Sequence, residues 1–117
     1  MNTWNEYSFE TSYVIRLTVA PYFIELVMDF ELLPSHPEYH LPAIGERACF
    51  RRGTIKIIGF RKILWNASGY APAHDANQEI DWGCLDQFEE RSDCWILGGD
   101  WGIIEIEGGK CQVTLNP

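Results

Sequence analysis

Apolar and polar residues alternate with a period of two along much of the chain, most clearly between residues 23 and 33. Every second position there is apolar: Ile24, Leu26, Met28, Phe30 and Leu32. Three of the positions between them are acidic: Glu25, Asp29 and Glu31. This alternation predicts a strand with one buried and one solvent-facing side. A helix over 22–33 is disfavoured because it would place Glu31 on the apolar side.

Residues 13–19 predict a second strand of the same kind. Its apolar positions are Tyr13, Ile15, Leu17 and Val19, with Arg16 and Thr18 on the opposite face. The two strands are joined near Ala20-Pro21, so we expect them to form an antiparallel pair.

Further strands are predicted in the middle of the chain. Residues 48–52 and 54–60 form two strands or one bent strand, with the break at Gly53. Ile55 and Ile57 face one way and Lys56 the other. Residues 80–84 form a short strand, and residues 85–88 are expected to form one helical turn before Asp93.

The end of the chain predicts a three-stranded meander over 94–97, 101–107 and 110–115. We expect Gly108-Gly109 to form a two-residue hairpin turn, since glycine adopts the required positive φ without steric cost. The expected inward residues are Ile104, Ile106, Cys111, Val113 and Leu115. The expected outward residues are Glu105, Glu107, Lys110, Gln112 and Thr114.

These elements predict a mostly β fold: a single antiparallel β-sandwich or half-open barrel of about seven strands, with at most one short helix. The 117 residues, 46% of them hydrophobic, suit one domain over residues 1–117. The most apolar stretch contains charged residues and Pro21, so we expect no transmembrane helix. The N-terminal residues lack the pattern of a secretory leader, and we expect a cytoplasmic protein.

The four cysteines are Cys49, Cys84, Cys94 and Cys111, and no two form a C-x-x-C pair. Their apolar neighbours favour reduced, buried thiols that act as small hydrophobic residues. Two disulfides or a metal site are the alternatives.

Charge is distributed unevenly along the chain. The formal net charge of −8 comprises −5 over residues 1–45, +5 over 46–62 and −8 over 63–117. One interpretation is that the basic segment pairs with Glu25, Asp29, Glu105 or Glu107 on neighbouring strands. The other is an exposed acidic face that attracts a basic protein partner. The net acidity argues against binding to nucleic acid.

Two groups of charged and aromatic residues are candidate binding sites. The candidate partner-binding residues are Asp81, Trp82, Asp86, Glu89, Glu90 and Asp93. Trp82 belongs to a run of three tryptophans that supply either core residues or a binding anchor. A candidate anion contact consists of Arg47, Arg51 and Arg52.

Signals for catalysis, cofactors or metals are weak. His36, His40 and His74 lie in two loops, 34–45 and 66–79, and histidines in exposed loops usually bind nothing. Glu105 and Glu107 share a strand face at the spacing of paired glycosidase carboxylates, but we expect that face to be solvated. Cys49 lies near several arginines, yet its apolar neighbours favour a core role over a reactive thiol. We therefore predict that the protein is not an enzyme and binds no cofactor.

Three features together resemble a known class of proteins: the opening two-strand unit, the segment Arg51–Ile57 (RRGTIKI) and the segment Gly99–Ile106 (GDWGIIEI). The arrangement resembles small, mostly uncharacterised bacterial all-β domains, some of which are grouped with the immunity proteins of polymorphic-toxin systems. The resemblance implies a cytoplasmic protein that neutralises a toxin by binding, and acidity suits a basic nuclease. The basic segment 46–62 departs from a wholly acidic inhibitor surface.

We therefore expect a small non-enzymatic protein-binding domain, with an immunity-type inhibitor as its most concrete form. The alternative is a small-ligand or metal-binding β domain whose site lies under loops 34–45 and 66–79.

Overall fold

A computed structural model of the chain describes residues 4–66, 73–74 and 80–116. Within these residues, a short 3₁₀ turn, η1 (Trp4–Glu6), is followed by eight strands. They are β1 (Tyr7–Val19), β2 (Phe23–Leu32), β3 (Phe50–Asn66), β4 (Ala73–His74), β5 (Ile80–Asp81), β6 (Gln87–Arg91), β7 (Cys94–Gly99) and β8 (Gly102–Leu115).

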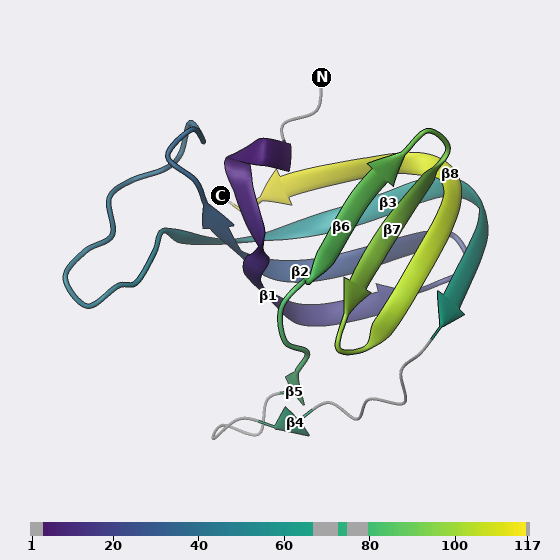
Figure 1. Cartoon of the computed structure of the whole chain (residues 1–117), viewed down its shortest axis with the longest axis horizontal. Helices are drawn as coiled ribbons and strands as arrows, with labels where there is room; N and C mark the ends of the chain where they lie inside the picture. Colours follow the sequence, from purple (N-terminus) through teal and green to yellow (C-terminus); the bar gives the residue numbers. More distant parts are fainter. Residues whose placement is uncertain (1–3, 67–72, 75–79, 117) are drawn as a thin grey trace.

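Six of these strands form one antiparallel sheet in the order β1-β2-β3-β8-β7-β6, and β4 pairs with β5 separately. The large sheet curls into a half-barrel, so that β6 and β7 lie in front of β1 and β2 in Figure 1. The predicted fold class is confirmed. Within the described residues, no helix is long and apolar enough to cross a membrane.

The core lies inside the curl and consists of the residues that the alternation predicts. All five alternating apolar residues of β2 are buried, as are Ile55 and Ile57 of β3 and Ile104 and Ile106 of β8. Trp95 and Leu97 of β7 belong to the same core cluster. Removing this apolar surface from water is the main stabilising contribution to the half-barrel.

The prediction of a hairpin at Gly108-Gly109 is wrong. Both glycines have positive φ, 74° and 91°, but they lie within the continuous strand β8. Opposite them, β3 has a positive φ at Gly59 and a bulge between Phe60 and Lys62. Positive φ therefore makes a corner in two paired strands here, because a bulge bends a strand without ending it.

Gly53 does not break the third strand. It is buried within β3 and pairs with both Met28 and Leu115. A Cβ at this position would lie 2.2 Å from the carbonyl oxygen of Thr114 and 2.9 Å from the Phe30 ring. Glycine is needed here for close packing, not for a turn.

Two other local predictions are wrong. The sequence predicts a helical turn before Asp93, but residues 87–91 form strand β6. The reason is that β7 pairs with them from Gln87 to Arg91. In β1, Val14 is buried and Tyr13 is 39% exposed, opposite to the expected phase. A register shift between Val14 and Arg16 then restores the phase, so that Leu17 and Val19 pack on the core.

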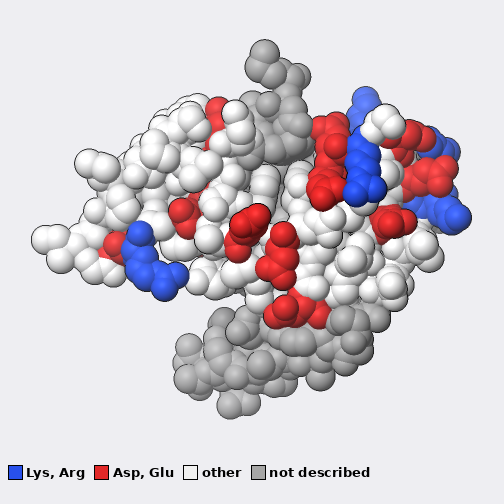
Figure 2. Space-filling view, viewed as in Figure 1, with Lys and Arg blue, Asp and Glu red and all other residues white. Residues whose placement is uncertain are grey.

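The basic segment lies between acidic strands, which confirms the pairing interpretation of its charges. Arg52 of β3 binds Asp29 of β2 at 2.6 Å, and Arg61 lies 3.6 Å from Glu107 of β8. Arg61 also binds Asp93 in the β6–β7 turn. Red and blue side chains accordingly lie next to one another at the right of Figure 2.

Candidate functional site

The two edge strands of the half-barrel, β1 and β6, approach one another along a line that we call the seam. Residues 83–85, just before β6, pair with β1: the Val14 N–H donates to Gly83 O at 2.8 Å, and the Leu85 N–H donates to Ser12 O at 3.2 Å. Tyr13 and Cys84 form the bridge between them. We call this part the closed end of the seam, because backbone pairing there unites the two edges.

Ser12 holds β1 in position for this pairing. The register between β1 and β2 jumps from Ser8–Glu31 to Tyr13–Asp29, so residues 9–12 bulge away from β2. The fully buried Ser12 hydroxyl donates to Ser8 O at 2.7 Å and accepts from the Glu31 N–H at 2.9 Å. Its side chain thus replaces the backbone partners that the bulge removes.

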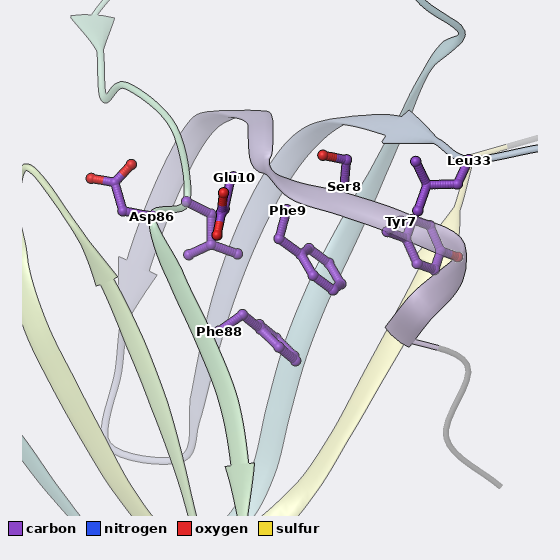
Figure 3. A pocket seen from close by; sticks show the side chains of 8 residues that line it. Tyr7, Ser8, Phe9, Glu10, Leu33, Asp86 and Phe88 are labelled. Atoms are coloured by element: carbon purple, nitrogen blue, oxygen red, sulfur yellow. The ribbon is translucent and has the colours of Figure 1, made fainter.

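Beyond the closed end, the seam opens into a pocket of about 320 Å³, which we call the seam groove. Figure 3 shows its lining from β1, β6 and the segments beside them. The lining residues are Tyr7, Ser8, Phe9, Glu10, Leu33, Leu85, Asp86 and Phe88. Side chains, not backbone bonds, span the seam at this end.

The floor of the seam groove is aromatic. Phe9 of β1 stacks on Phe88 of β6 with ring centroids 4.6 Å apart and planes 17° apart. Tyr7 continues the stack, 5.5 Å from Phe9. The three rings are half-buried, so they contribute both to the core and to the lining of the groove. Rings placed in this way supply large contact areas for a bound group.

The rim of the seam groove is acidic. Glu10 of β1 and Asp86, just before β6, both line it and are exposed. Within the described part of the chain, neither carboxylate takes part in an ion pair or a side-chain hydrogen bond. Other carboxylates are held by arginines: Asp29, Glu38, Glu89, Asp93 and Glu107. The rim therefore carries negative charge that the described residues leave uncompensated.

The Tyr7 phenol lines the groove close to two further carboxylates, which are not those of the rim. Burial raises the pKa of its phenol above the ordinary value, and the nearby carboxylates Glu6 and Glu38 raise that pKa further. The phenol oxygen lies 3.2 Å from His36 Nε2. Because phenolate is disfavoured beside negative charges, Tyr7 stays neutral at physiological pH.

Those predicted partner-binding residues whose side chains are described lie in different surroundings. Asp86 lines the seam groove, whereas Trp82 packs half-buried against the core. Glu89 accepts from Gln87 and Arg91, which lower the pKa of its carboxyl. The Asp81 side chain lies outside the described residues.

The remaining two predicted acids lie elsewhere. Asp93 is bound by Arg61 in the β6–β7 turn. Glu90 occupies the face of β6 opposite to Glu89, and its charge acts on Cys111. Burial, with a smaller contribution from Glu90, raises the pKa of the Cys111 thiol to about 12.

The three arginines of the candidate anion contact are engaged within the chain. Arg51 binds Glu38 and Asn116 O, each at 2.7 Å, and Arg52 binds Asp29. Arg47 Nη2 lies 3.4 Å from the Tyr13 hydroxyl. Arg51 and Arg52 are successive strand residues, so the structure does not bring them together on one face.

The loop histidines make local contacts. His36 Nδ1 accepts from the Glu38 N–H at 3.0 Å, and His40 Nδ1 lies 3.1 Å from Leu41 O. The His74 side chain and most of loop 66–79 lie outside the described residues. Among the residues that are described, no group of three or more histidine, cysteine or acidic side chains is arranged to hold a metal ion.

The other weak signals concern the cysteines and the two outward glutamates of β8. All four cysteines are free thiols, with Cys49 buried in the core and the other three half-buried. Glu105 and Glu107 face outward as predicted, and Glu107 lies near Arg61.

Sequence reasoning missed Tyr7, Phe9 and Glu10, because it began the first strand at residue 13, whereas β1 begins at Tyr7. The alternation of Tyr7 and Phe9 was the available signal for this part of the strand. Their approach to Phe88, nearly 80 residues later, had no local signal.

Comparison of the chain with protein-family models, with curated proteins and with solved structures gave no match to any of them. The geometry and charge of the seam groove are therefore the features that bear on function.

Proposed function

We propose that this protein is a non-enzymatic protein-binding domain that holds a basic partner at the seam groove. The observation that carries the proposal is a pair of carboxylates, Glu10 and Asp86, which no described residue binds and which lie at the rim of an aromatic groove. An immunity-type inhibitor, which neutralises a basic toxin by binding it, is the most concrete form of this function.

Two physical properties of the groove support a protein partner. Binding energy at protein interfaces concentrates on aromatic residues in pockets surrounded by polar groups. Phe9, Phe88 and Tyr7 have this position, with the two carboxylates at the edge. The charge also matters at longer range, because negative potential accelerates the approach of a basic surface.

The location of the basic residues supports the same partner chemistry. The arginines of β3 are occupied by carboxylates of the chain itself, as shown for Arg51, Arg52 and Arg61. They therefore contribute little free positive potential, while the groove keeps its negative charge. Free thiols at all four cysteines support a reducing compartment such as the cytoplasm as the place of action.

A small-ligand function is the second candidate, since the volume of about 320 Å³ lies at the lower end of the range for ligand pockets. The site would then lie at the seam. A site under loops 34–45 and 66–79 stays a prediction, because most of loop 66–79 lies outside the described residues. A small cation would raise the melting temperature by mass action.

The proposal is tested with two synthetic peptides that differ only at four alternate positions, occupied by Lys and Arg in one and by Glu in the other. We expect the basic peptide to bind and its Kd to rise about tenfold or more between roughly 0.05 and 0.5 M salt. The acidic peptide should not bind. Isothermal titration calorimetry measures both affinities.

The double variant Glu10→Gln/Asp86→Asn identifies the site. It should weaken binding of the basic peptide, whereas Glu105→Gln, an exposed acid on the outer face of β8, should not. Equal binding of both peptides, or no binding of the basic one, would contradict the proposal.

A further inference from the structure

We infer that the seam groove recognises an arginine side chain of the partner, in preference to a lysine. This inference rests on the proposed function and specifies the chemical group that occupies the groove.

The aromatic floor favours a planar cation. Phe9 stacks on both Phe88 and Tyr7, and the three rings together form an apolar wall of the groove. A guanidinium group is planar and more weakly hydrated than an ammonium group, so it can lie against such a wall with a smaller loss of hydration free energy. A lysine ammonium is compact and strongly hydrated, so it loses more hydration free energy when it enters an apolar groove.

The two carboxylates approach the groove from different elements. Glu10 belongs to β1 and Asp86 precedes β6, so they flank the seam from its two sides. Guanidinium presents five N–H donors in a fixed planar fork, which allows it to donate to more than one carboxylate at the same time. The pocket volume of about 320 Å³ is small for a ligand site, which suits one long side chain.

The chain itself uses arginine in this way elsewhere. Arg52 donates to Asp29 through two nitrogens, at 2.6 and 3.4 Å, and Arg91 donates to Glu89 through two nitrogens, at 3.2 and 2.9 Å. The carboxylates of the seam groove lack such a partner among the described residues. A guanidinium from outside the chain would complete the same interaction there.

The test uses three basic peptides that are identical except for one central residue: arginine, lysine or citrulline, the neutral isostere of arginine. We expect the arginine peptide to bind about five- to tenfold more tightly than the other two. Asp86→Asn and Glu10→Gln should each reduce this preference. Glu105→Gln should leave it unchanged.

The outcomes separate the inference from the proposed function. If all three peptides bind equally, or if the arginine preference survives both groove carboxylate variants, the inference is overturned while basic-partner binding stands. If none of the peptides binds, the proposed function fails as well. Because Asp86 and Glu10 are exposed, their variants should retain the wild-type circular dichroism spectrum and melting temperature, which excludes unfolding as the cause.

Discussion

The two ends of the seam are built from the same pair of strands and differ in what joins them. At the closed end, backbone hydrogen bonds and the buried Ser12 hydroxyl satisfy the polar groups of the strand edges. At the groove, aromatic side chains span the seam, and two carboxylates remain without partners among the described residues. The closed end thus stabilises the half-barrel, whereas the carboxylates of the groove make no contribution to the fold through pairing with described residues. Variants of the closed end should therefore reduce stability, and charge variants of the groove should reduce binding alone.

The largest loss of stability is expected from Leu85→Ala at the closed end. Leu85 is fully buried, and its truncation removes apolar contacts and leaves a cavity. We expect the free energy of unfolding to fall by about 3 kcal/mol, measured by urea denaturation. Leu41→Ala is the matched control, because Leu41 is 81% exposed and should change stability by less than about 0.5 kcal/mol. Similar values for the two variants would contradict a closed end that stabilises the fold.

Ser12→Ala should lower the free energy of unfolding by about 1–3 kcal/mol, because it leaves the Glu31 N–H and the Ser8 carbonyl without their partner in a buried position. The neighbouring Thr11 also forms side-chain hydrogen bonds, but it is exposed and water can replace them. Thr11→Ala should therefore have the smaller effect in the same urea titration. A larger effect for Thr11→Ala would show that the bulge is not held by Ser12.

The double variant Glu10→Gln/Asp86→Asn should give the opposite pattern at the groove. Its free energy of unfolding should stay within about 0.5 kcal/mol of wild type, because the two carboxylates are exposed and unpaired within the described residues. Binding of the basic peptide should weaken by about tenfold or more. A marked loss of stability would mean that these carboxylates serve the fold, and the contrast between the two ends would disappear.

The smallest expected effect is on the titration of Tyr7. Its pKa lies above the ordinary value of 10.0 because of burial and then Glu6 and Glu38, so Glu38→Gln should lower that pKa. Because the pKa of Tyr7 is higher in the folded state than in the unfolded state, protonated Tyr7 favours the folded state below about pH 10. This contribution is lost as the pH rises through the folded-state pKa. Ultraviolet absorbance titration of the tyrosines measures the pKa, with Tyr7→Phe to identify the Tyr7 signal. Urea denaturation at several pH values measures the stability. An unchanged pKa in Glu38→Gln would exclude a Coulombic contribution from that carboxylate.

The residues of the candidate site were only partly predictable. Asp86 stands out in the sequence because it lies in an acidic segment, but so do Glu89 and Asp93, which arginines occupy in the structure. Whether a carboxylate is paired depends on which strands become neighbours. Phe9 and Phe88 come together only because the sheet curls until its two edge strands, β1 and β6, meet.

The sequence by itself determined the class of fold and the inward faces of β2, β3 and β8, since alternation with a period of two is a property of each strand alone. It also offered the pairing of the basic segment with acidic strands as one of two interpretations, because the four candidate partners lie on outward positions of predicted strands: Glu25, Asp29, Glu105 and Glu107. Tertiary structure decided the role of Gly108-Gly109, the strand at residues 87–91 and the phase of β1 around Val14. The physical reason is common to these three: positive φ, a short polar segment or a bulge is compatible with several local conformations, and hydrogen bonds to a distant strand select one. The seam exists only when the sheet has curled, so the groove and its charge belong to the tertiary structure.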